Sequence, residues 1–94
     1  MSEENKTQWR NMPFRVLDQV AQAVTNGDKK YAPMDWVKKD PALFKDALMR
    51  HISAWFQGER NDPEDDIHHL AHAIVNCMYL MEKEEMKKEE AVCA

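Results

Sequence analysis

The sequence contains few of the residues that interrupt helices or build strands. Of its 94 residues only two are glycine and four are proline, and runs of β-branched residues are absent. Because strands are rich in β-branched residues and are joined by glycine-containing turns, this composition argues against a β-sheet protein. There is also no internal repeat. The expected fold class is therefore all-α.

Long hydrophobic runs and cysteine pairs are missing as well. No apolar stretch approaches the roughly 18 residues of a membrane-spanning helix, and no signal-peptide pattern is present. Cys77 and Cys93 are the only cysteines, which fits a reduced intracellular protein better than a disulfide framework. These absences predict a soluble, cytoplasmic protein with no membrane partner.

Basic blocks and common catalytic motifs are absent too. The formal net charge is −4 and no run of lysine or arginine exceeds two residues, so a nucleic-acid duplex is not expected as a partner. There is no glycine-rich phosphate loop, no cysteine pair with zinc-finger spacing and no His-Asp doublet. Ser2 and Ser53 lack the glycines of a nucleophile elbow. Such an acidic chain suits a chelated metal or a metal–nucleotide complex.

The spacing of apolar residues predicts three helices. The first covers about 13–26 and ends before Gly27, because a glycine commonly follows a helix end. The second covers about 41–57, between an aspartate that can cap it and a following glycine. The third covers about 61–81 and starts with acidic residues, which the helix dipole favours.

These helices would form one small helical-bundle domain, residues 13–81. A flexible segment, 1–12, precedes it, and a charged helical or frayed tail, 82–94, follows it. A bundle of this size buries little surface and is a marginal monomer. Seven methionines and apolar positions such as Ala73 and Leu80, expected to be exposed, favour packing against further copies. We therefore expect a homo-oligomer, a dimer or tetramer, to complete the bundle.

The third helix has two contrasting faces. At about 100° per residue, one face carries an apolar stripe that is expected to form the core. The opposite face carries groups that bind metal, move protons or recognise a polar ligand. The apolar stripe consists of Ile67, Leu70, Ala71, Ile74, Met78 and Met81, and the polar face of Asp65, His69, His72 and Asn76.

The polar face supplies the first candidate site. His69, His72 and Asn76 would line the bundle interior, in the way that helical bundles build metal sites from inward side chains. Asp62 and Glu64 are the nearest candidate acids for a metal. The alternatives stay open: the histidines could form a polar seam of a dimer or hydrogen-bond to the backbone, and Asp62 could simply cap the third helix.

The second helix adds candidates of its own. His51 lies among apolar residues and should point inward, either as a satisfied core group or as part of the site. Asp46 and Arg50 are spaced as an exposed i,i+4 pair. If they face the bundle instead, Arg50 could clamp a phosphate.

A loop of about 13 residues, 28–40, joins the first two helices. Loops of this length in small domains are often binding loops. Lys30, Tyr31 and Trp36 could contact phosphate and stack on a base. The alternative is that the aromatic pair pins the loop to the bundle.

Taken in order along the chain, these residues resemble a known family. The resemblance covers about residues 13–81 and is to the phage and bacterial family of dATP/dGTP diphosphohydrolase N-terminal domains, related to the MazG-like all-α nucleoside triphosphate pyrophosphatases. The segments that carry it are Gly27-Asp28-Lys29-Lys30-Tyr31, Trp36, Ala47-Leu48-Met49-Arg50-His51, Trp55, Gly58-Glu59, Asp62-Pro63-Glu64, His69-Leu70-Ala71-His72-Ala73 and Asn76.

The resemblance implies an oligomeric helical bundle that binds Mg²⁺ or Mn²⁺. It would cleave a nucleoside triphosphate, a purine dNTP by the family name, into monophosphate and pyrophosphate, in the host cytoplasm if the protein is phage-encoded. The implied roles are as follows: Asp62, Glu64, His69 and His72 hold the metal or its waters, His51 or Asp46 orients the attacking water, Lys30 and Arg50 contact phosphate, Tyr31 or Trp36 packs on the base, and Asn76 contacts the nucleotide.

The chain departs from the MazG-like pattern in its first helix. Asp18, Gln19 and Gln22 stand where a glutamate pair would be expected. Glu59 and Asp62 match the second acidic motif by letter but are predicted to lie in a turn. Two alternatives to an enzyme therefore stay open. One is a non-catalytic nucleotide-binding or sequestering phage protein acting against host defence, and the other is a protein-interaction bundle.

Overall fold

The computed structural model describes residues 6–93, and the side chains among them up to residue 90. Over this range the chain is all-α, as predicted, and its only β-type pairing is an isolated bridge between Asn61 and His68. None of the described helices is both long and apolar enough to cross a membrane. The elements are η2 (Trp9–Asn11), α1 (Phe14–Lys30), η3 (Asp35–Lys38), α2 (Pro41–Phe56) and α3 (His69–Cys93), where η denotes a short 3₁₀ helix.

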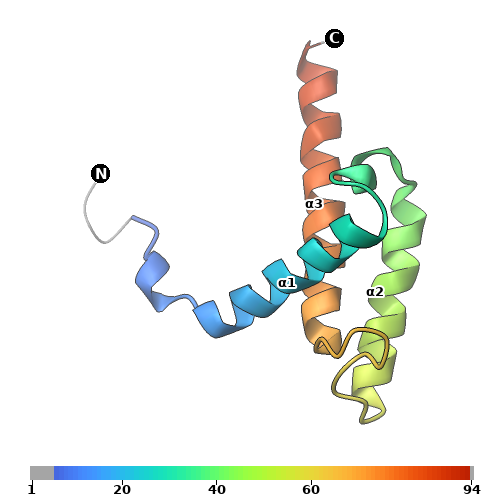
Figure 1. Ribbon diagram of the computed structural model, residues 1–94. Coiled ribbons are helices and arrows are strands. Elements are labelled where there is room, and N and C mark those ends of the chain that lie inside the picture. Colours follow the sequence, from blue (N-terminus) through green and yellow to red (C-terminus); the bar gives the residue numbers. More distant parts are fainter. Residues whose placement is uncertain (1–5, 94) are drawn as a thin grey trace.

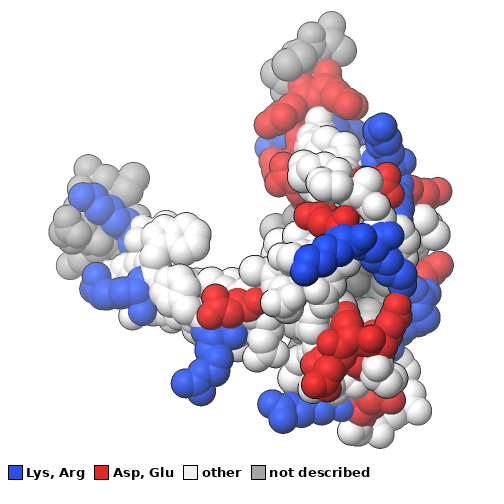
Figure 2. Space-filling view, viewed as in Figure 1, with Lys and Arg blue, Asp and Glu red and all other residues white. Residues whose placement is uncertain are grey.

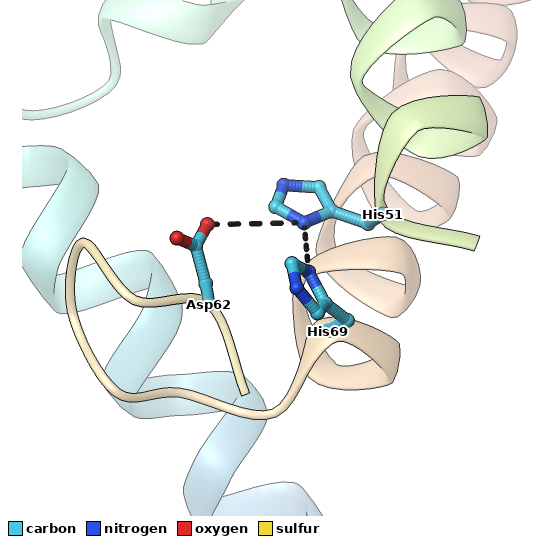
Figure 3. A group of neighbouring side chains, drawn as sticks. All are labelled: His51, Asp62 and His69. Carbon is cyan, nitrogen blue, oxygen red and sulfur yellow. Dashed lines mark hydrogen bonds and ion pairs between the residues drawn. The ribbon is translucent and has the colours of Figure 1, made fainter. Parts of the chain in front are cut away.

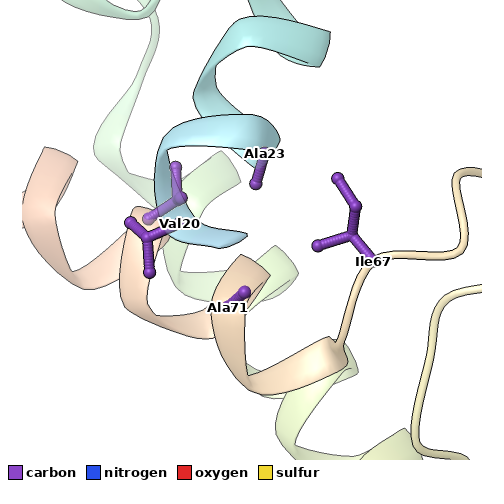
Figure 4. Close-up of a cluster of buried hydrophobic side chains, with 5 residues drawn as sticks. Val20, Ala23, Ile67 and Ala71 are labelled. Atoms are coloured by element: carbon purple, nitrogen blue, oxygen red, sulfur yellow. The ribbon is translucent and has the colours of Figure 1, made fainter. Parts of the chain in front are cut away.

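Helix α3 is the centre of the fold, because both other long helices pack against it. Figure 1 shows α2 running beside the first half of α3, while α1 crosses α3 and its N-terminal part projects away. A small core lies at the crossing (Figure 4). Its buried members are Val20, Ala23, Ile67, Ala71 and Val75.

The predicted second helix is confirmed, with its signals at both ends. The side chain of Asp40 accepts a hydrogen bond of 2.9 Å from the amide of Ala42, and Pro41 occupies the first helical position. Gly58 follows the helix with a φ of 104°, a conformation that favours glycine.

The predicted end of the first helix was wrong. Helix α1 continues through Gly27 to Lys30, and the amide of Tyr31 still bonds to the carbonyl of Gly27 at 3.0 Å. Lysines in the last turn favour this extension, because positive charge stabilises a helix C-terminus. The extra turn carries Lys30 to the edge of the cavity described below.

The predicted start of the third helix was also wrong. Residues 59–68 form a closed acidic loop, and α3 begins only at His69. The amide of Asp62 bonds to the carbonyl of Ile67 at 2.8 Å, and Asp66 turns the chain with a positive φ of 59°. Beyond residue 81 the helix continues to Cys93, so the described part of the charged tail belongs to α3 itself.

The two faces of α3 lie differently from the prediction. The polar face packs inward: His69 and Asn76 are 4% and 8% exposed, and Ala73, expected at the surface, is buried. The apolar stripe is divided, since Ile67 and Ala71 are buried in the core whereas the more C-terminal members are exposed. Periodicity identifies faces but does not say which one is covered. The exposed members are Ile74, Met78 and Met81.

Candidate functional site

A cavity of about 640 Å³ lies between the C-terminal end of α1, η3, α2, α3 and the acidic loop. Its walls bring together all the residues predicted for the site except Asp46 and His69. The predicted residues that line it are Lys30, Tyr31, Trp36, Arg50, His51, Asp62, Glu64, His72 and Asn76. Asp46 is exposed and does not line the cavity, whereas His69 lies directly behind His51.

Two aspartates of the acidic loop are held by the loop backbone. Asp62 accepts the amide of Glu64 at 2.9 Å through Oδ1, and Asp65 accepts the amide of Ile67 at 3.0 Å through its own Oδ1. Side chains that cap a nearby amide in this way fix both the turn and their own orientation. In each case the second carboxylate oxygen, Oδ2, faces the histidines of α2 and α3.

Behind Asp62 a carboxylate and two imidazoles form a chain of contacts. His69 Nε2 lies 2.6 Å from Glu59 Oε1, and His69 Nδ1 lies 2.8 Å from His51 Nδ1. A carboxylate can only accept, so Nε2 of His69 carries a proton and donates it. In neutral His69 the Nδ1 atom is then an acceptor, and His51 donates to it. Figure 3 shows the same His51 nitrogen facing Asp62 Oδ2, at 3.9 Å.

His72 lies on the other side of His51, and the two rings stack with their centroids 4.6 Å apart. His72 Nε2 is 2.8 Å from Asp65 Oδ2, within reach of an ion pair. The same nitrogen is buried and makes no hydrogen bond of acceptable geometry, so the short distance does not satisfy it. A buried nitrogen without a directed partner is uncommon, which makes His72 Nε2 a candidate to contact a water, an ion or a ligand.

The environment of His51 favours its neutral form. Burial lowers the pKa of His51 below the usual 6.5, and the nearby charges of His72, His69 and Arg50 lower it further. The carboxylate of Asp62 acts in the opposite direction, but burial has the largest effect and the pKa remains lowered. Neutral imidazole is the form that ligates metals.

Aromatic residues close one end of the cavity. Trp36 stacks on Tyr79 with centroids 4.6 Å apart, and Phe44 meets Tyr79 edge-on at 5.4 Å. The ammonium group of Lys83 donates to the carbonyls of Trp36 and Val37 at 3.2 and 2.8 Å. Trp36 thus pins η3 to α3, the alternative left open from the sequence, while it also lines the cavity.

Basic groups stand at the rim of the cavity. Lys30 forms an exposed ion pair of 2.7 Å with Glu64, and this contact raises the pKa of Lys30. Lys39 Nζ sits 3.9 Å from the centre of the Tyr31 ring. Figure 2 shows basic side chains over the end of α1 beside acidic side chains over the loop. The cavity therefore offers cations to an anionic ligand and carboxylates to a metal.

The structure adds an acid, Asp65, that the sequence prediction missed. Among the described residues, two groups of side chains have potential ligand atoms within 4.8 Å of one another: His51, Asp62 and His69 form one, and Asp62, Asp65 and His72 the other. Asp65 replaces Glu64, which belongs to neither group. The sequence contained a signal for Asp65, because this residue lies on the predicted polar face of the third helix, three residues after Asp62.

Comparisons with known proteins identify the family of the chain. A family model described as dATP/dGTP diphosphohydrolase, N-terminal, matches residues 1–93. A relative from Salmonella phage PMBT28, named dATP/dGTP diphosphohydrolase, is 29% identical over 66 residues. That alignment covers 70% of the chain but only 23% of the relative. No solved structure matches the chain. The match along nearly its whole length shows that the chain belongs to the family of dATP/dGTP diphosphohydrolase N-terminal domains, a family of nucleotide hydrolases.

Proposed function

We propose that this chain binds and hydrolyses a purine deoxynucleoside triphosphate, with Mg²⁺ or Mn²⁺, to the monophosphate and pyrophosphate. The observation that carries the proposal is the cavity, which combines two aspartates oriented by the loop backbone with basic residues at its rim. Its volume of about 640 Å³ lies in the range of small-molecule sites. The name of the phage relative supports the choice of dATP or dGTP.

Asp62, Asp65 and His72 are the residues proposed to hold the nucleotide-associated cation. The Oδ2 atoms of both aspartates are not used by the loop backbone, and the buried Nε2 of His72 has no directed partner. Carboxylates suit Mg²⁺ and Mn²⁺. A divalent cation held there would supply positive charge to the triphosphate and would make the attacking water more acidic.

The other walls of the cavity would position the substrate. Lys30 and Arg50 reach a triphosphate from the rim, where guanidinium and ammonium groups pair with phosphate oxygens. His51 presents a ring to the cavity that can hold the attacking water or a phosphate oxygen. In the proposed reaction, water attacks the α-phosphorus and the bond from this phosphorus to the oxygen that bridges to the β-phosphorus breaks. Pyrophosphate leaves and one proton is released.

The base would lie at the aromatic end. Tyr31 is 58% exposed and would contact the base, with Lys39 Nζ 3.9 Å from its ring centre, whereas Trp36 already stacks on Tyr79. Asn76 lines the cavity and donates its Nδ2 to the carbonyl of His72 at 2.9 Å, which fixes its orientation. The amide oxygen of Asn76 then remains as an acceptor for the nucleotide.

We also propose that a second copy of the chain covers the exposed part of the apolar stripe, formed by Ile74, Met78 and Met81. The core within one chain is small, with five buried apolar residues in its cluster. Large apolar side chains left in water along one helix face are typical of a subunit interface. The relation to the MazG-like enzymes and a site of action in the cytoplasm stay predictions.

The test is pyrophosphate release from a panel of triphosphates with Mg²⁺ or Mn²⁺. We expect turnover of dATP or dGTP, and its loss in Asp65→Asn and His72→Gln. Glu84→Gln, an exposed acid on α3 outside the cavity, is the matched control and should keep full activity. Turnover that survives both site variants would refute the proposed site.

A binding measurement separates hydrolysis from sequestration. Thermal stabilisation by dATP or dGTP without pyrophosphate release would favour the non-catalytic nucleotide-binding alternative. Absence of both, together with a change of oligomeric state in His69→Ala, would favour the protein-interaction bundle.

A further inference from the structure

Asp62 also belongs to a second set of ligand atoms, which does not include His72. His51, His69 and Asp62 each have a ligand atom within 4.8 Å of the other two, and Figure 3 shows His69 and an oxygen of Asp62 both facing the same nitrogen of His51. They come from three elements: α2, the start of α3 and the acidic loop. Their side chains are shielded, with exposures of 18%, 6% and 19% for His51, His69 and Asp62.

Glu59 explains why His69 is oriented toward His51. Its carboxylate accepts Nε2–H of His69 at 2.6 Å, so the lone pair of His69 is left on Nδ1. The side chain of Glu59 is 52% exposed and does not line the cavity, so it is not expected to contact a substrate there. A carboxylate bound to the far nitrogen of an imidazole is the arrangement that orients histidines in metal sites.

The 2.8 Å contact between the two imidazoles marks where a cation would sit. One proton now lies between the two Nδ1 atoms. Ligand nitrogens on a tetrahedral transition metal stand roughly 3.3 Å apart, so the pair must open by about half an ångström. Neutral His51 would then carry its proton on Nε2, which Figure 3 shows on the side away from His69.

We propose that His51, His69 and Asp62 bind a first-row transition-metal cation of the Zn²⁺ class, with Glu59 orienting His69. Two imidazoles and one carboxylate favour such a cation over Mg²⁺. Three protein ligands leave a fourth position for water, as in catalytic zinc sites. The proposal does not depend on triphosphate cleavage, and it shares only Asp62 with the cation site proposed above. Asp62 would bridge the two sites if both were filled.

The experiment measures metal binding by the untagged full chain carrying Cys77→Ser and Cys93→Ser, which removes thiolates as competing ligands. Zn²⁺ affinity comes from competition with a chelator, and visible absorption of bound Co²⁺ reports nitrogen ligation. We expect one tightly bound ion per chain. Glu59→Ala should lower its affinity by about 10- to 100-fold. His69→Gln, which removes a ligand, should lower it further.

Two variants serve as controls. His68→Asn changes the neighbouring histidine, whose Nδ1 accepts the amide of Leu70 at 3.0 Å, and asparagine can keep that cap. His72→Gln changes the other cation site. Both should retain tight Zn²⁺ binding. Because His69 is buried, circular dichroism must show that His69→Gln folds, and the exposed Glu59 gives an independent test if it does not.

The outcomes separate this proposal from the proposed function. Zn²⁺ affinity unchanged in both Glu59→Ala and His69→Gln would overturn the site, and so would a loss confined to His72→Gln. Tight binding that depends on His69 supports the site even if no triphosphate is cleaved. Turnover of dATP without any tight Zn²⁺ or Co²⁺ binding would leave the proposed function standing and overturn this inference alone.

Discussion

Asp62 offers the sharpest prediction, because its two carboxylate oxygens have separate tasks. Oδ1 accepts the amide of Glu64 at 2.9 Å, and Oδ2 faces His51. Asp62→Asn keeps an oxygen for the turn but puts an amide group in place of Oδ2. Asp62→Ala removes both functions. We therefore expect both variants to lose hydrolysis, and only Asp62→Ala to lose the turn hydrogen bond.

The size of the difference follows from one hydrogen bond. A hydrogen bond of this kind contributes about 0.5–1.5 kcal/mol to the free energy of unfolding. In a domain of this length, each kcal/mol corresponds to roughly 4–8 °C in melting temperature. Thermal unfolding without metal or nucleotide should therefore place Asp62→Ala several degrees below Asp62→Asn, with the latter close to the unmodified chain.

The same comparison at Asp65 provides the internal control, since its Oδ1 accepts the amide of Ile67 at 3.0 Å. Asp65→Asn and Asp65→Ala should differ in the same direction. If the Asn and Ala variants melt together, and both far below the unmodified chain, the carboxylate charge rather than the turn hydrogen bond holds the loop. That result would refute the separation of tasks, as would full hydrolytic activity in Asp62→Ala.

Three further predictions concern other parts of the molecule. Folding lowers the pKa of His51, so as the pH falls this imidazole is protonated in the unfolded chain before it is protonated in the folded chain. The metal-free free energy of unfolding should therefore decrease as the pH drops below about 6.5. Denaturant unfolding of His51→Gln should show a flatter dependence on pH. Trp36→Ala should lower the free energy of unfolding by about 1–2 kcal/mol through loss of the stack on Tyr79, and unchanged stability in denaturant would contradict that role. Met78→Lys should shift light-scattering mass toward the monomer, whereas an unchanged mass would remove the exposed stripe from any subunit interface.

The sequence predicted the three helices and both ends of α2, because periodicity and caps are local. Asp40 and Gly58 bound α2 as expected, since each acts on the chain within a few residues. The start of α3 was predicted wrongly because it depends on a contact that is not local. Asp62 satisfies the rules for a helix N-cap, yet it caps a turn, and the closure of that turn depends on the carbonyl of Ile67 five residues later.

The orientation of α3 could not be predicted from its own residues. An inward His69 is stable only because Glu59 and His51 supply partners from other elements. Such partners satisfy polar groups that would otherwise oppose burial, and their positions depend on the packing of α2 against α3. Most of the predicted candidate residues therefore line the cavity, but the sequence could not show which of them lie close together.

The acidic loop has one further consequence. Backbone amides hold Asp62 and Asp65 in place, so the loop keeps two carboxylates close together. Like charges held at such a distance repel each other, and this repulsion opposes the hydrogen bonds of the loop. A bound cation would turn that repulsion into attraction. The amides of residues 59–68 should consequently exchange with solvent faster than the core of α3, and should slow more than any other segment when a divalent cation is added.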